Sequence, residues 1–138
     1  MVTSKVIYNG ELSTVAKHEK SGTEIVSDAP TDNNGLGRSF SPTDLLATSL
    51  ASCMLTMMGI RANESKLNIE GSNANVTKIM AANPRRVSEV KVEIEIYDRG
   101  LSSVQRTGLE KTALSCPVAL SLRHSLKQTV SFIYKDVV

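Results

Sequence analysis

The sequence predicts an α+β fold, and three observations support that class. Short apolar runs near the N-terminus are separated by Asn-Gly and Ser-Gly dipeptides, a spacing typical of an antiparallel meander. A long stretch without charge, Leu45–Ile60, predicts a buried helix. From Val87 to Ile96, Val and Ile alternate with charged residues, which predicts a half-exposed strand. The three N-terminal runs are Lys5–Tyr8, Leu12–Lys17 and Thr23–Val26.

The long helix has a recognisable start and an unusual surface. Ser41 fits the N-cap, Pro42 the first helical position, and Asp44 the acid of a capping box. Five apolar residues recur at spacings of three and four and are expected to share a face: Leu46, Leu50, Cys53, Met57 and Ile60. The other side carries small residues and Met rather than charge, which is typical of a helix buried all round. Because one small subunit cannot cover such a helix, the sequence predicts a homodimer.

The remaining segments complete the expected element order. Asp28–Phe40, rich in Asp, Asn and Gly, is expected to be a loop. Leu67–Ile79 is expected to pair with the strand at Val87–Ile96. Two helices and a closing strand follow, namely Ser102–Leu114, Pro117–Ser125 and Thr129–Tyr134. Since no repeat or long linker interrupts the chain, a single domain over residues 1–138 is expected.

Composition excludes several classes of function. The chain has 138 residues, 41% of them hydrophobic and 22% charged, which fits a globular domain. The net charge of +2 is small and no basic cluster is interleaved with aromatics, so nucleic-acid binding is not expected. The N-terminus lacks the apolar core of a signal peptide, and Leu45–Ile60 is shorter than the roughly 20 residues that span a bilayer. A cytoplasmic protein that does not bind membranes is predicted, in a compartment where thiols stay reduced.

Two cysteines are the candidate reactive groups. Cys116 precedes Pro117 at a predicted helix start, where backbone N–H groups and the helix dipole are expected to lower its pKa. Cys53 lies well inside the long helix, where desolvation opposes the thiolate, so a cation is expected nearby. Arg38 is the only arginine that precedes Cys53, and Lys5, Lys17 and Lys20 are the other candidate cations.

Simpler interpretations stand beside this one. Cys53 could be a small core hydrophobe, Cys116 a buried cap, and Arg38 a solvated loop residue. The cysteines together with His18 and His124 could in principle bind zinc, but their spacing lacks the close pairs typical of structural zinc sites. No metal is therefore expected, and no glycine-rich nucleotide motif indicates another cofactor.

The two cysteine motifs together resemble those of a known family. Ser41-Pro-x-x-Leu-Leu-Ala, followed by Ala-Ser-Cys53, and a later Cys116-Pro-Val are similar to the motifs of the OsmC/Ohr family of thiol peroxidases, particularly its divergent OsmC-like branch. The resemblance implies antiparallel sheets around a long central helix that carries Cys53, in an intertwined homodimer with active sites at the subunit interface. It also implies that Cys53 attacks the peroxide and that Cys116 resolves the sulfenic acid as a disulfide.

The resemblance also implies activating groups. An arginine and a glutamate near the first cysteine orient the peroxide in this family, and Arg38 is the candidate arginine. The glutamate's position, ten residues before the cysteine, is occupied by Thr43 and followed by Asp44. Thr43 and Asp44 are therefore the candidates for an orienting or activating role.

Two functions follow as hypotheses. The first is a peroxidase that reduces organic hydroperoxides without a cofactor and is regenerated by a dithiol reductant, with a lipoyl-type dithiol among the options. The alternative is an OsmC-fold dimer without peroxidase activity that binds a small apolar ligand in its interface cleft. The retained cysteine pair favours the first hypothesis, and the missing glutamate favours the second.

Overall fold

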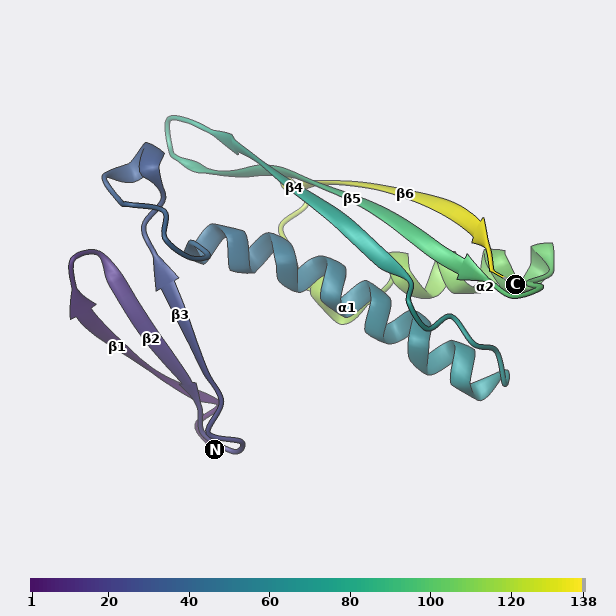
Figure 1. Cartoon of the computed structure of the whole chain (residues 1–138). Coiled ribbons are helices and arrows are strands. Elements are labelled where there is room, and N and C mark those ends of the chain that lie inside the picture. The colour runs from purple at the N-terminus through teal and green to yellow at the C-terminus, as the bar shows by residue number, and fades with distance from the viewer. Residues whose placement is uncertain (138) are drawn as a thin grey trace. The chain divides into compact units, whose positions relative to one another are not determined.

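The computed structural model describes residues 1–137 and confirms the α+β class. The chain forms two compact units, one covering Met1–Leu46 and the other beginning at Ala47. The single domain over the whole chain stays a prediction. Figure 1 shows the elements in chain order. They are β1 (Ser4–Gly10), β2 (Ser13–His18), β3 (Glu24–Asp28), the 3-10 turn η1 (Thr31–Asn33), α1 (Pro42–Glu64), β4 (Asn73–Ala81), β5 (Arg86–Asp98), α2 (Ser103–Leu114), α3 (Pro117–Ser121) and β6 (Lys127–Asp136).

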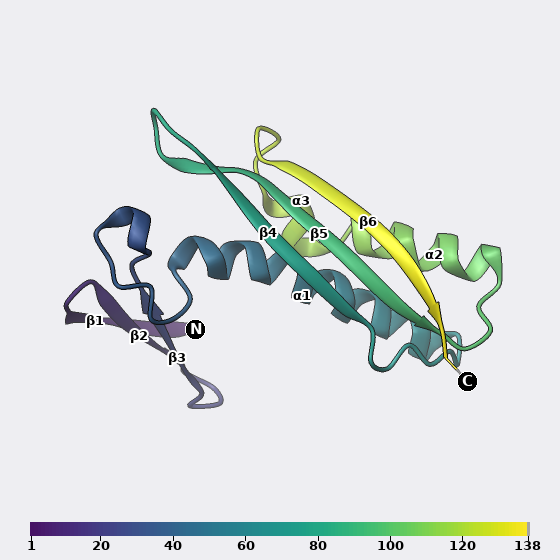
Figure 2. The same cartoon turned by 45° about the horizontal axis from the view of Figure 1, so that its top comes forward.

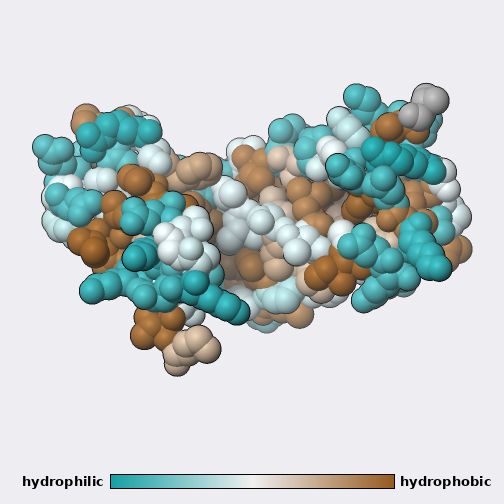
Figure 3. Space-filling model, turned by 60° about the horizontal axis from the view of Figure 1, so that its bottom comes forward, coloured by the Kyte–Doolittle hydropathy of each residue, from teal (hydrophilic) through white to brown (hydrophobic). Residues whose placement is uncertain are grey.

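The first unit contains the predicted antiparallel meander, with strand order β1-β2-β3. Only two of its strand residues are buried, Ser27 and Asp28 at the end of β3. Apart from the half-buried Val15, its larger apolar side chains are about half exposed or more, and apolar surface is visible on this unit at the left of Figure 3. They include Val6, Ile7, Tyr8, Ile25 and Val26. This sheet therefore has no apolar core of its own, although a sheet normally buries one face.

The second unit contains the sheet β4-β5-β6, and its pairing corrects one expectation. β4 and β5 form the predicted antiparallel hairpin, with a cis Asn83-Pro84 bond in its turn. β6, by contrast, runs parallel to β5. The expectation of purely antiparallel sheets was wrong because α2 and α3 lie between β5 and β6 in the chain. Such a crossover lets the next strand enter the sheet in the same direction as the one before it.

The core of the second unit lies between one face of this sheet and the helices. Figures 1 and 2 show α1 and α2 on the same face of the sheet. Val90, Val92, Ile94 and Ile96 of β5 are fully buried against them, while the alternating Glu and Lys side chains point away. The alternation read from the sequence is thus confirmed.

The face of α1 that is buried within the chain overlaps only partly with the predicted apolar stripe. Leu50 is buried as expected, but Leu46 and Ile60 are exposed, and Cys53 and Met57 are only half-buried. The side chains that reach the core lie about one position further round the helix: Ala47, Leu50, Ala51, Met54, Met58 and Ala62. Spacing alone could not show which side packs within the chain, because apolar and small residues occupy nearly every position of α1.

α1 also meets a simple criterion for a membrane span. By length and composition alone it could cross a bilayer, a test that core helices of soluble proteins pass as well. The predictions of a cytoplasmic protein without membrane contact stay predictions.

The shorter elements match the expected order with shifted ends. α2 ends at Leu114 as predicted and begins one residue later than predicted, because Ser102 is its N-cap and forms a capping box with Gln105. α3 ends at Ser121, earlier than the expected Ser125. β4 begins at Asn73, because the segment before it turns through positive φ values at Lys66 and Gly71. A Cβ at Gly71 would lie 2.6 Å from the Tyr97 ring, so only glycine fits that turn.

Candidate functional site: a dithiol and an arginine–aspartate pair

The fold brings the two cysteines together within the second unit. Cys53 is half-buried on α1 and Cys116 is buried at the start of α3, and both thiols are free. Cys53 packs against the core cluster that contains Cys116, and its proximity raises the pKa of the Cys116 thiol. Two cysteines far apart in the sequence therefore form one dithiol.

The environment of Cys116 corrects the expected direction of its pKa. The thiol is the N-cap of α3, and the Ala119 N–H donates to its sulfur at 3.4 Å. That hydrogen bond favours the thiolate, but burial raises the pKa of Cys116 above its ordinary value, and Cys53 raises it further. The prediction of a lowered pKa was wrong because α3 has only five residues, and its few N–H groups do not offset the loss of water.

Arg38 is held by a carboxylate that the sequence interpretation did not single out. Asp28 Oδ2 accepts hydrogen bonds from the Arg38 backbone N–H at 2.8 Å and from Nε at 2.9 Å. Asp28 Oδ1 accepts a third bond from Nη2 at 3.1 Å. The guanidinium lies at the surface while Asp28 is buried, and their hydrogen bonds hold the pKa of Asp28 below its usual range. Arg38 is therefore a fixed cation rather than a mobile loop side chain.

Arg38 and Asp28 line a hollow in the first unit. Its volume is about 380 Å³, and the hairpin tip that joins β1 to β2 forms another part of its wall. Glu11 at that tip has a positive φ of 53° and adds its negative charge to the field around Arg38. Within residues 1–137 no hydrogen bond is made by Nη1 of Arg38, so this nitrogen can donate to a bound molecule.

Thr43 and Asp44 lie in the first turn of α1, where their contacts belong to the helix start. The Asp44 carboxylate accepts from the Ser41 N–H at 2.9 Å, and the Asp44 N–H donates to Ser41 Oγ at 3.0 Å. This pair is the predicted capping box. Thr43 Oγ1 lies 3.2 Å from Ser41 Oγ. These residues and Arg38 belong to the first unit, and the two cysteines belong to the second.

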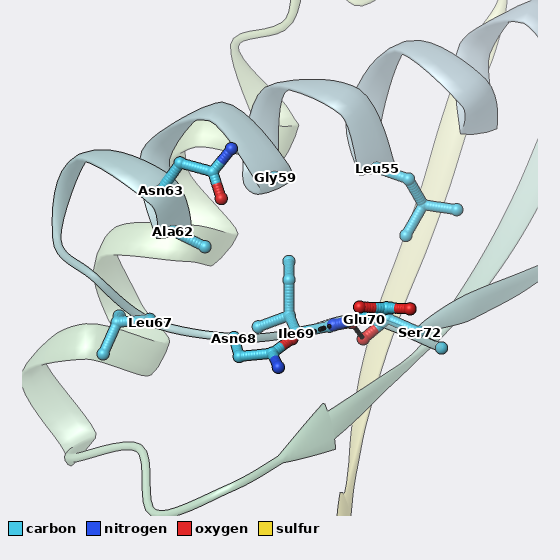
Figure 4. Close-up of a pocket in the computed structure, with 10 residues that line it drawn as sticks. Leu55, Gly59, Ala62, Asn63, Leu67, Asn68, Ile69, Glu70 and Ser72 are labelled. Carbon is cyan, nitrogen blue, oxygen red and sulfur yellow. Dashed lines mark hydrogen bonds between the residues drawn. The ribbon is translucent and has the colours of Figure 1, made fainter.

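A separate hollow lies beside the C-terminal half of α1. It measures about 490 Å³, and Figure 4 shows Leu55, Gly59 and Asn63 of α1 on one side and residues 67–72 on the other. Its wall is partly apolar, with Asn68 and Glu70 among its polar groups. Neither cysteine lines it.

The two histidines lie outside the dithiol site. His18 Nδ1 lies 2.6 Å from Ser21 Oγ on the first sheet, and His124 is exposed in the loop before β6. Among residues 1–137 no three His, Cys, Asp or Glu side chains gather as metal ligands would.

A two-sheet α+β protein with one half-buried and one buried cysteine close together is the class that this fold and site define. The chain belongs to the OsmC-like protein family, whose model matches residues 34–131, so the resemblance found in the sequence is confirmed. No curated protein matches the chain.

Solved structures agree with the family assignment. A protein from Psychrobacter arcticus 273-4, assigned to the osmotic stress induced and detoxification response, is 52% identical, with a TM-score of 0.91 and 96% of each chain covered. An OsmC-like protein from Mycoplasma pneumoniae is 22% identical, with a TM-score of 0.78 over 95% of this chain and 94% of that one. An organic hydroperoxide resistance protein OsmC from Legionella pneumophila is 18% identical, with a TM-score of 0.71 over 96% and 98%. The last two likenesses concern the fold.

Proposed function

We propose that this protein is a thiol-dependent peroxidase that reduces organic hydroperoxides, with Cys53 as the peroxidatic cysteine and Cys116 as the resolving cysteine. The observation that carries the proposal is the proximity of two thiols of different exposure, since Cys53 raises the pKa of the buried Cys116. The half-buried Cys53 is open to a substrate, while burial keeps Cys116 protonated and away from it. Family membership and the hydroperoxide-resistance protein among the structural neighbours support the same chemistry.

The proposed reaction balances in three steps. The Cys53 thiolate attacks one peroxide oxygen, an S–O bond forms, the O–O bond breaks, and the departing alkoxide takes a proton to become an alcohol. The Cys116 sulfur then attacks the sulfenic acid, an S–S bond forms, and the oxygen leaves as water after accepting a proton. A dithiol reductant, of the lipoyl type among the options, exchanges with this disulfide and is itself oxidised.

Arg38 is the proposed activating cation. Its guanidinium would favour the Cys53 thiolate and donate to the peroxide oxygens. Asp28 takes the orienting role that the family's glutamate would have, because it fixes Arg38 through three hydrogen bonds. Thr43 and Asp44, by contrast, are engaged in capping α1, which favours a structural role for both.

The active form is proposed to be a homodimer. The exposed apolar side chains of the β1-β2-β3 sheet and the exposed apolar residues of α1 support this, because an isolated chain would leave both in water. Light scattering at micromolar concentration tests the idea. A stable folded monomer would contradict it.

Cysteine variants test the peroxidase function most directly. Cumene hydroperoxide should oxidise the wild-type dithiol, so that thiol titration loses both free thiols per chain. Cys53→Ser should abolish turnover and sulfenic-acid trapping. Cys116→Ser should still form one sulfenic acid per chain but no intramolecular disulfide. The opposite pattern would show that the two roles are reversed, and unchanged thiols in the wild type would refute the peroxidase function.

The second candidate function is the binding of a small apolar ligand without peroxide chemistry. The hollow of about 490 Å³ beside α1 favours it, since this volume suits a small molecule. The same thiol titration separates the candidates. A binding protein would keep both thiols after exposure to the peroxide.

A further inference from the structure

A further pocket, in the unit that begins at Ala47, is lined by cationic residues that have no part in the proposed peroxide chemistry. It lies between the last turn of α1 and the first half of α2 and has a volume of about 350 Å³. Two of its lining residues are cationic, two carry hydroxyl groups, and none is acidic. These residues are Arg61, Lys111, Ser103, Thr107, Val104 and Gly108.

Gly108 allows Arg61 to lie against α2. A Cβ at position 108 would lie 2.7 Å from Nη2, 3.0 Å from Nε and 3.1 Å from Cζ of Arg61, closer than side chains pack. Glycine is the least favourable residue in a helix interior after proline, yet it occupies the middle of α2. The backbone surface that it exposes is therefore where the guanidinium rests.

The guanidinium of Arg61 keeps its hydrogen-bonding capacity. Arg106 and Arg99 of the same unit donate to Asp98 and to the Asn68 carbonyl. Within residues 1–137, by contrast, the Arg61 side chain makes neither a hydrogen bond nor an ion pair. Lys111 places a second positive charge on the same pocket. Both side chains are exposed, so an anion can reach them from the solvent.

The hydroxyl groups complete the lining. Thr107 Oγ1 donates to the Ser103 carbonyl at 3.0 Å, which uses its hydrogen and fixes its side chain. Ser103 Oγ makes no hydrogen bond within residues 1–137, so its hydrogen is available to an oxyanion. A guanidinium fork, an ammonium group and a hydroxyl together match the oxygens of a phosphate group.

We propose that this pocket binds a phosphate group, either as the free anion or as part of a phosphomonoester, through Arg61 and Lys111, with Gly108 as the floor. This site is distinct from the cysteine pair, and its existence does not depend on the peroxidase function. The inference rests on the close approach of Arg61 to Gly108, the unpaired guanidinium and the absence of acidic residues from the pocket lining.

Calorimetric titration of the full chain tests the proposal, with inorganic phosphate and glycerol phosphate as probes and chloride keeping the ionic strength constant. We expect saturable binding of at least one probe. Tighter binding of glycerol phosphate would assign the site to a monoester, and tighter binding of inorganic phosphate to the free anion. Failure of both to bind would refute the proposal.

Three variants and a matched control locate the binding. R61Q should weaken it about tenfold or more, the effect of losing one charge-assisted contact, and K111Q should weaken it as well. G108A should weaken it by displacing the guanidinium while leaving every charge in place. R123Q removes an exposed arginine of the same unit outside this pocket and should bind like the wild type. Equal losses in R61Q and R123Q, or full binding by a folded G108A, would overturn the assignment. Thiol titration of each variant reports on the peroxidase chemistry separately.

Discussion

The role of Arg38 can be tested by a substitution that keeps its positive charge but removes the planar guanidinium group. Arg38 donates to Asp28 through Nε at 2.9 Å and Nη2 at 3.1 Å, two bonds that only a planar fork makes together. Arg38→Lys keeps a positive charge but can replace at most one of these bonds with a less fixed geometry. One charge-assisted contact corresponds to about a tenfold change, so Arg38→Lys should slow peroxide reduction about tenfold. Arg38→Ala, which also removes the charge, should slow it further.

The assay follows consumption of cumene hydroperoxide in the presence of excess dithiol at pH 7 and pH 9. Arg38→Ala should recover part of its rate at pH 9, because alkaline solution supplies thiolate without help from a cation. Arg123→Lys, at an exposed position, is the matched control and should keep the wild-type rate. A wild-type rate for both Arg38 variants at pH 7 and pH 9 would show that Arg38 only stabilises the loop that carries it. Thiolate activation would then come from another group.

Three further outcomes are expected. Asp28→Asn should slow peroxide reduction with little change in secondary structure, because it removes the charge that orients Arg38; a wild-type rate in the same assay would remove Asp28 from the proposed site. The pKa of Cys116 is raised in the folded protein, so the neutral thiol stabilises the fold at pH 7, and this stability is lost as the pH rises through the folded-state pKa. Between pH 7 and pH 10, the free energy of urea unfolding should therefore fall more for the wild type than for Cys116→Ser. Equal decreases would contradict the burial argument. Met54→Ala should lower the free energy of unfolding by about 2–5 kcal/mol, since Met54 is fully buried. Met57 is only half-buried, so Met57→Ala should lower it by less. The reverse order would show that the side of α1 that carries Met57 contributes more of the core packing.

Features that depend on neighbouring residues in the chain were predictable from the sequence. The capping box of Ser41 and Asp44, the alternation in β5 and the end of α2 at Leu114 all have the expected form. Each depends on contacts between residues a few positions apart or on a regular spacing of apolar residues, and both can be recognised from the sequence alone.

Features that depend on tertiary packing were not predictable in the same way. The direction of β6 follows from a crossover rather than from its own residues, and the buried face of α1 follows from what packs against it. The raised pKa of Cys116 arises because burial outweighs a favourable position at a helix start. Likewise, the candidate orienting residues Thr43 and Asp44 lie at the start of α1, whereas the carboxylate that holds Arg38 is Asp28. Asp28 was available as a signal, since it ends β3 at the base of the loop that carries Arg38.

The asymmetry of the dithiol links these packing effects to the proposed chemistry. If both thiols were exposed and readily ionised, either could react with peroxide, and two sulfenic acids could form on one chain. Burial keeps Cys116 protonated at neutral pH, so in the proposed reaction it would not compete for the peroxide, yet it lies close enough to Cys53 for Cys53 to raise its pKa. A sulfenic acid formed on Cys53 would therefore meet its resolving partner without a long-range movement of the chain. The same packing that raises the pKa of Cys116 thus distinguishes the two thiols in the way that the proposed reaction requires.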